Sequence, residues 1–201
     1  MAHSLKPIEK LTREFSKLPG MGLKTATRLA YYVVRMGEDS VNDLSEAIQA
    51  VHREVTICPK CYGYALNSGE CDVCSDGARD SNYLCVVERP QDVFVIERGD
   101  FNGRYHVLNG VVSPLDGIGP DDIKLNELIE RIKKERPQEV VVALNSSVEG
   151  DATTLYIAKL LNGMDVRVSR LARGVPAGAS IDYVDDTTLC RALEERQDVV
   201  C

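Results

Sequence analysis

The stretch Cys58-Pro59-Lys60-Cys61 … Cys71-Asp72-Val73-Cys74 decides how this chain is organised. Its four cysteines follow the pattern C-x2-C-x9-C-x2-C. Each C-x2-C pair forms a tight knuckle that directs two sulfur atoms at one centre, so two knuckles supply the four thiolates of a tetrahedral zinc site. Because four thiolates leave no coordination position for water, one zinc ion per chain would be structural and not catalytic. The same stretch separates a short helical amino-terminal part from a long α/β carboxy-terminal part.

The composition indicates a soluble protein of one large or two small domains. The 201 residues are 44% hydrophobic and include no tryptophan, which predicts a mostly aliphatic core. No 18-residue apolar run and no signal-peptide pattern occurs, so we expect a cytoplasmic protein without a membrane partner. An odd count of seven cysteines in a reducing compartment argues against a disulfide framework. We expect Cys85, Cys190 and Cys201 to be buried or terminal thiols.

The charge is distributed unevenly along the chain. The formal net charge is −7, which is unusual for a protein that binds nucleic acid. Residues 1–35 nevertheless hold seven lysines and arginines against two glutamates, a balance of +5 that leaves −12 for the remainder. A basic front on an acidic body indicates an anionic partner bound at one end.

Hydrophobic periodicity predicts three helices followed by alternating strands and helices. We expect the first three helices at 6–17, 23–35 and 41–55, the third with Ser40 or Asn42 as its N-cap. After Asp80 the apolar runs predict strands at 83–87, 105–108, 140–144 and 166–168, and helices at 92–98, 121–135, 151–162 and 185–196. Strands that are apolar on both faces and alternate with helices predict a parallel sheet covered by helices.

The loop Leu18-Pro19-Gly20-Met21-Gly22 between the first two helices is a candidate phosphate-binding site. Glycines allow close approach of a ligand, and the following helix N-terminus favours an anion. The cations around this loop would bind DNA phosphates without contacting the bases, and therefore without sequence specificity. The predicted DNA-binding residues are Lys17, Gly20, Gly22, Lys24 and Arg28. A plain helix–helix turn with solvated lysines is the alternative. A nucleotide-binding P-loop is a weaker alternative, because the G-x4-G-K-[ST] spacing is absent.

Three carboxylates follow predicted strands, at the edge where ligands bind in open parallel sheets: Glu88, Glu149 and Asp151. Converging carboxylates would suit Mg²⁺, whose preferred ligands are oxygens. A solvated acidic surface is the alternative. A nuclease, primase or topoisomerase would need a nucleophile beside the metal, and neither Tyr156 nor Tyr183 is a strong candidate.

The chain resembles the recombination mediator family RecR along nearly its whole length. Leu18-Pro19-Gly20-Met21-Gly22-x-Lys24-x-Ala26-x-Arg28 is similar to a helix-hairpin-helix DNA-binding motif. The zinc cysteines follow it, and then come Cys85-Val86-Val87-Glu88, Glu149-Gly150-Asp151-Ala152-Thr153, Ala172-Arg173-Gly174-Val175-Pro176-Ala177-Gly178 and Asp185-Asp186-Thr187-Thr188-Leu189. The ordered combination is far more specific than any one motif.

The resemblance implies a multi-part α+β fold of four segments. These are a helix-hairpin-helix region (1–55), a four-cysteine zinc finger (56–78), an α/β Toprim domain with a mainly parallel sheet (79–172) and a carboxy-terminal oligomerisation segment (173–201). In Toprim domains a strand-end glutamate and a D-x-D pair hold a metal ion, and here glutamate replaces the first aspartate of the pair. Residues 181–186 resemble the family's Walker-B-like segment, although Asp185 is more simply an N-cap for the last helix.

The resemblance also implies a function in DNA repair and recombination. It implies a non-enzymatic, ring-like homotetramer that encloses single- or double-stranded DNA, associates with the nucleoid during repair, and acts with RecO or RecF to load recombinase on gapped DNA. The acidic Toprim surface would then receive a partner protein. The alternatives are a Mg²⁺-dependent Toprim nuclease or primase, and an adaptor that binds only proteins.

Overall fold

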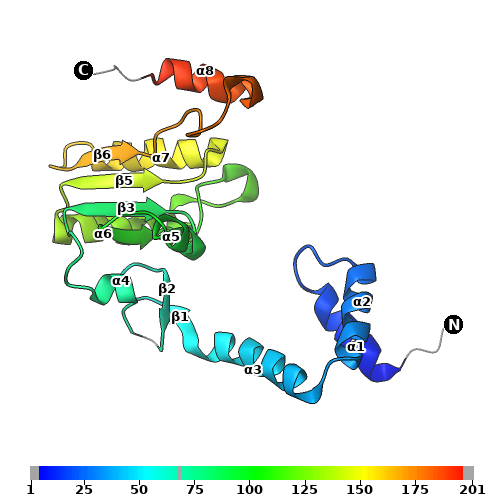
Figure 1. The fold of residues 1–201 in the computed structure, drawn as a ribbon. Coiled ribbons are helices and arrows are strands. Elements are labelled where there is room, and N and C mark those ends of the chain that lie inside the picture. The colour runs from blue at the N-terminus through cyan, green and yellow to red at the C-terminus, as the bar shows by residue number, and fades with distance from the viewer. Residues whose placement is uncertain (1–4, 68, 197–201) are drawn as a thin grey trace. The chain divides into compact units, whose positions relative to one another are not determined.

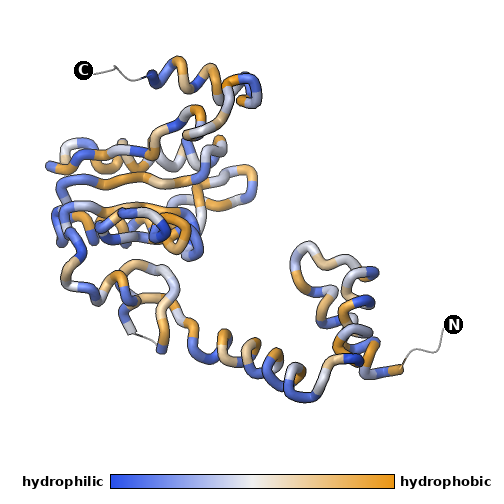
Figure 2. Tube along the Cα trace, viewed as in Figure 1, coloured by the Kyte–Doolittle hydropathy of each residue, from blue (hydrophilic) through white to orange (hydrophobic). Residues whose placement is uncertain are grey.

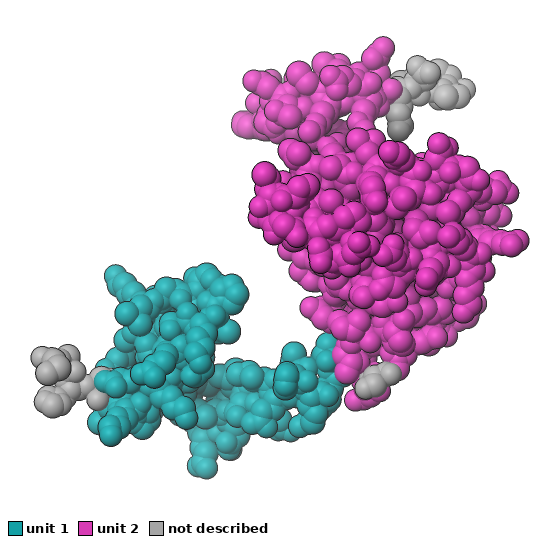
Figure 3. Space-filling model, turned by 180° about the vertical axis from the view of Figure 1, so that it is seen from behind, with its two compact units in different colours: residues 1–55 teal, residues 56–201 magenta. Residues whose placement is uncertain are grey.

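The computed structural model describes residues 5–67 and 69–196, and the chain divides into two compact units (Figure 3). Unit 1 spans residues 1–55, and unit 2 spans residues 56–201. The finer division of unit 2 into three segments stays a prediction. In the part of the chain that the structure describes, no helix has the length and apolar composition needed to cross a membrane.

Unit 1 contains three helices: α1 (Lys6–Ser16), α2 (Leu23–Val34) and α3 (Glu38–Glu54). The first two pack against each other, and the small side chains of Ala26 and Ala30 are fully buried in α2. Small residues allow two helix backbones to approach closely, which explains the compact antiparallel pair. The predicted start of the third helix is wrong, because α3 begins at Glu38 after the N-cap Gly37. Acidic residues in its first turn favour this earlier start through the helix dipole.

Unit 2 is built on a four-stranded sheet (Figure 1). Its strands are β3 (Tyr83–Val87), β4 (Arg104–Val107), β5 (Glu139–Ala143) and β6 (Arg167–Arg170). They run parallel in the order β4-β3-β5-β6, which confirms the predicted parallel sheet with bounds shifted by one or two residues. The order reverses direction between β3 and β5, and ligand crevices in open α/β sheets lie at such a point.

Apolar side chains pack on both faces of this sheet. The trace of β5 is accordingly coloured mostly as hydrophobic in Figure 2. On one face, Leu84 and Val86 pack with residues of α6 (Leu125–Glu135) and α7 (Val148–Leu161). On the other face, Cys85 and Val87 pack with α5 (Pro90–Ile96). Successive residues of β3 point to opposite faces, so a strand buried on both sides must be apolar throughout.

The remaining elements of unit 2 flank the sheet. A small two-stranded sheet, β1 (Val55–Ile57) and β2 (Tyr64–Leu66), and the short helix α4 (Asp72–Ser75) carry the cysteines. Three 3₁₀ turns (Pro114–Asp116, Pro120–Asp122, Ile181–Tyr183) and α8 (Asp186–Glu194) complete the chain. The predicted helix at 121–135 begins as one of these turns, and its α-helical part starts only at Leu125.

Asp185 is the N-cap of α8, as predicted from its position before Thr188. Its carboxylate accepts hydrogen bonds from the backbone N–H of Thr188 at 2.9 Å and from the Thr188 hydroxyl at 2.7 Å. Cys85 is buried as expected, but Cys190 is exposed on α8, and Cys201 lies outside the described residues. The prediction of a buried thiol at Cys190 is therefore wrong.

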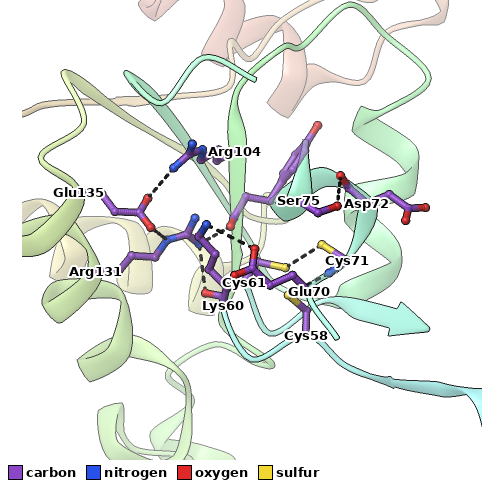
Figure 4. A network of polar contacts seen from close by, with 11 residues as sticks. Cys58, Lys60, Cys61, Glu70, Cys71, Asp72, Ser75, Arg104, Arg131 and Glu135 are labelled. Atoms are coloured by element: carbon purple, nitrogen blue, oxygen red, sulfur yellow. Dashed lines mark hydrogen bonds and ion pairs between the residues drawn. The ribbon is translucent and has the colours of Figure 1, made fainter. Parts of the chain in front are cut away.

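The buried Arg131 attaches the cysteine-bearing loop to the sheet (Figure 4), and the buried His106 contacts Tyr62 of the same loop. Arg131 of α6 donates from Nη1 to the carbonyl oxygens of Tyr105 at 2.6 Å and Lys60 at 3.3 Å. The backbone N–H of Val107, on the free edge of β4, donates to the carbonyl of Cys61 at 2.8 Å. The loop thus satisfies part of a sheet edge that would otherwise be open.

We expect the stability of unit 2 to fall between pH 7 and pH 5 because of His106. The ring is fully buried, Nε2 lies 2.7 Å from the Lys124 carbonyl oxygen, and the ring meets Tyr62 edge-on at 5.4 Å between centroids. Burial lowers the pKa of His106 to about 4 from 6.5. Between these values the unfolded chain binds a proton that the folded chain excludes, so acidification favours unfolding by about 2 kcal/mol over this range.

Urea unfolding of wild type and His106→Gln at both pH values measures this contribution. Glutamine stays neutral, and its amide can donate to the same carbonyl. The loss of stability on acidification should therefore be smaller in the variant by about 2 kcal/mol. Equal losses in the two proteins would show that His106 does not titrate as its burial requires.

Candidate functional site

The four cysteines predicted to bind zinc come together in one cluster. Cys58 and Cys61 lie in the turn between β1 and β2, Cys71 is the N-cap of α4, and Cys74 lies within α4. Their sulfur atoms are all within 4.8 Å of one another. Tetrahedral zinc with Zn–S bonds of about 2.3 Å holds its sulfurs about 3.8 Å apart, so the spacing fits this ion.

Backbone amides support negative charge on these sulfurs. The N–H of Gly63 donates to Cys61 Sγ, and the N–H of Cys71 donates to Cys58 Sγ, each at 3.4 Å. Cys61 Sγ and Cys71 Sγ are 3.5 Å apart. Their hydrogen bond lowers the pKa of Cys71 and raises the pKa of Cys61 to about 12. Crowded thiols cannot all ionise without a cation, and a dication removes that conflict.

The predicted hairpin is a tight turn between α1 and α2. The N–H of Met21 donates to the Leu18 carbonyl at 3.0 Å, and Gly20 has a φ of +75°, which other residues rarely adopt. Gly22 is the N-cap of α2 with a φ of −70°, and a Cβ there would meet open space. Gly20 is thus required by the backbone, whereas Gly22 only keeps the helix entrance uncovered.

The cations of the hairpin are exposed. Neither Lys24 nor Arg28 forms an ion pair within the described residues. Lys17 pairs with Glu14 at 2.7 Å, and because solvent screens this exposed pair, an anion can readily replace Glu14. The first turn of α2 has no acidic residue and no side-chain cap, which leaves its N–H groups available to an anion.

The three predicted carboxylates lie at the carboxyl edge of the sheet, where the strand order reverses. Glu88 follows β3, whereas Glu149 and Asp151 occupy the first turn of α7, after β5. Ser147 is the N-cap of α7, and its hydroxyl accepts from the N–H of Gly150 at 3.0 Å. A Cβ on Gly150 would lie 2.1 Å from the Asn145 carbonyl oxygen, so the residue between the two acids must be glycine.

Each carboxylate has a different environment. Glu88 accepts from Asn145 Nδ2 at 2.7 Å, and Asp151 accepts two hydrogen bonds from Arg173, one of them at 3.1 Å. Arg173 thereby lowers the pKa of Asp151. The carboxylate of Glu149 forms no hydrogen bond or ion pair with any residue that the structure describes, and only its backbone carbonyl accepts a hydrogen bond, from the Thr153 hydroxyl at 2.7 Å.

These three carboxylates do not form a metal-ligand group. Within residues 5–67 and 69–196, only the four cysteines bring three or more candidate ligand atoms together. The predicted convergence on Mg²⁺ is therefore not supported, although the residues share one edge. The sequence alone did not predict the partners Asn145, Ser147 and Arg173. Only Ser147, an N-cap residue type three positions before its partner Gly150, left a local signal.

We expect Cys58→Ser to lose bound zinc and to reduce the stability of unit 2 by about 3 kcal/mol or more, because the loop that attaches to β4 would lose its crosslink. Elemental analysis of zinc per chain and thermal unfolding measure both effects. Cys190→Ser, at an exposed cysteine outside the cluster, is the matched control and should keep one zinc. A full zinc content in Cys58→Ser would rule out coordination by four thiolates.

Comparison with known proteins matches the three parts of the chain in order. The helix-hairpin-helix of RecR matches residues 8–52, the Toprim domain matches residues 82–172, and the carboxy-terminal region of RecR matches residues 174–197. The chain is also 47% identical over 199 residues to the recombination protein RecR of Bdellovibrio bacteriovorus, a match that covers 96% of this chain and 97% of that relative. With this identity over nearly its full length, the chain belongs to the RecR family, a family of recombination mediators and not of enzymes.

Proposed function

We propose that this protein is a ring-like homotetrameric clamp that binds DNA without regard to sequence and acts with RecO and RecF to load recombinase on gapped or single-stranded DNA. The proposal rests on Lys24 and Arg28, two exposed cations beside the Gly20 turn that form no ion pair with any described residue. Cations next to free helix amides bind phosphate oxygens, which all DNA sequences share. We place the protein in the cytoplasm, on the nucleoid during repair.

A ring accounts for DNA binding by an acidic protein. The formal charge of −7 opposes association with a polyanion, and the +5 of residues 1–35 is too small to hold DNA tightly as a single site. In a ring of four chains, four such basic segments would line one hole and raise the local concentration of cations. A ring that encloses DNA would also retain it without high affinity at any single site.

The acidic edge of the sheet suits a protein partner better than DNA. Glu149 carries an unpaired negative charge at this edge, which repels phosphates but complements a basic protein surface. RecO or RecF would meet this edge while the hairpin holds DNA. The structural zinc would be held by Cys58, Cys61, Cys71 and Cys74 and would take no part in chemistry.

The double variant Lys24→Glu/Arg28→Glu should lose DNA binding and keep its fold. Wild-type affinity should also fall with salt, with a log–log slope of about −0.9 per phosphate neutralised on duplex DNA. Mobility shifts across a salt series measure both effects, and circular dichroism checks the fold.

The matched control is Lys159→Glu/Arg167→Glu, which makes the same charge change at exposed residues of unit 2. It should bind DNA nearly as wild type does. Equal loss of affinity in both double variants would mean that net charge, and not the hairpin, governs binding. No affinity of the wild type at low salt would leave a purely protein-binding adaptor.

The clamp predicts a particle of four 22.2 kDa chains that stays on circular DNA after a salt challenge but leaves linear DNA through its ends. Light scattering gives the mass, and retention on nicked circular and linearised plasmid gives the topology. A monomer, or equal release from both plasmids, contradicts the ring. Incubation with labelled DNA, Mg²⁺ and nucleotides tests the rival enzyme, for which Glu149→Gln would have to abolish an observed cleavage or synthesis.

A further inference from the structure

We propose that the Arg173 guanidinium occupies the position in which Toprim domains bind a divalent metal ion, at the sheet edge that carries the three carboxylates. We also propose that its ion pair with Asp151 holds residues 167–194 against α7. The inference deepens the proposed function, since it explains why this edge serves protein binding and not catalysis. It rests on the contacts of Asp151 and on the charges that surround it.

Arg173 engages both oxygens of Asp151. Nη1 donates to Oδ2 at 3.1 Å, and Nη2 donates to Oδ1. A bidentate guanidinium–carboxylate pair directs its donors along the lone pairs that a metal ion would use. Both side chains are largely shielded, with exposed fractions of 16% for Arg173 and 31% for Asp151, so solvent screens the pair less than it would at an open surface. The oxygens of Asp151 are therefore occupied.

The positive charges of two further arginines also disfavour a divalent cation at Asp151. Arg191 of α8 and Arg170 of β6 both act on Asp151, and each of them, like Arg173, lowers the pKa of that carboxyl. Arg170 in turn forms an ion pair with Glu195. A divalent ion at Asp151 would have to displace Arg173 and would be repelled by these further positive side chains.

The second ligand position is likewise unsuited to a metal. The side-chain amide of Asn145 donates to Glu88, and Arg89 Nε lies 3.8 Å from the other oxygen of Glu88. One donor and one cation thus contact the two oxygens of this carboxylate, whereas a metal site would add further oxygen ligands. The residues present thus do not fit Mg²⁺. The same loop after β6 that carries Arg173 leads to α8, so the ion pair joins the carboxy-terminal segment to the body of unit 2.

Manganese binding to the zinc-loaded full-length protein, measured by the electron paramagnetic resonance of free Mn²⁺, tests the proposal. Wild type should show no binding that depends on Asp151. The Arg173→Ala variant should bind Mn²⁺ at least about tenfold more tightly than wild type does. Arg173→Ala/Asp151→Asn should lose this gain, and Arg173→Lys, which keeps a cation, should behave as wild type. Arg167→Ala removes an exposed arginine from β6, the strand that precedes the loop of Arg173, and should leave Mn²⁺ binding unchanged.

Hydrogen exchange supplies a readout that does not depend on metal. Arg173→Ala and Asp151→Asn should each speed exchange in α8, while Arg167→Ala should not. The proposal is overturned if wild type binds Mn²⁺ through Asp151, if Arg173→Ala binds no tighter than Arg167→Ala, or if α8 is equally protected in all variants. None of these outcomes affects the DNA binding of the hairpin, so failure here and failure of the clamp are distinguishable.

Discussion

The meeting of four cysteine sulfurs within 4.8 Å is the constraint on which unit 2 depends. Four thiols this close cannot all ionise alone, so the cluster requires a dication to be stable as thiolates. The first knuckle then presents the carbonyls of Lys60 and Cys61 to Arg131 and to Val107 of β4. These bonds cover an otherwise open sheet edge and place Tyr62 against His106. The cysteine cluster is thus part of the packing of the sheet and not a separate appendage.

The candidate sites of the two units carry charges of opposite sign. Exposed cations lie beside a glycine turn in unit 1, and carboxylates line the switch point of the parallel sheet in unit 2. Either feature alone has a bland explanation as solvated surface. In the proposed function, their separation into different units would allow an acidic protein to hold a polyanion with one part and a basic protein with the other, since each partner would be repelled from the wrong site.

Periodicity predicted the strands and helices of the parallel sheet, and local spacing predicted the clustering of the four cysteines and the Asp185 cap. Element ends were less predictable. The start of α3 moved to Glu38 because Gly37 ends the preceding turn and the acids after it suit a helix N-terminus. Contacts between distant segments were beyond reach. No local pattern indicates that Arg131 bonds the Lys60 carbonyl or that Arg173 pairs with Asp151, since only the folded topology makes these residues neighbours.

The three carboxylates at the switch point illustrate how a shared fold can lose a metal site without losing its acids. The topology alone places Glu88 and Asp151 at one sheet edge, as the fold requires of a metal-binding Toprim domain. Their partners decide the chemistry, because an amide donor on Glu88 and a guanidinium on Asp151 use the oxygens that a metal would need. The carboxylate of Glu149 has no partner among the described residues. A recruitment surface needs only such a charge, whereas a metal ion needs carboxylate oxygens that are free to coordinate it.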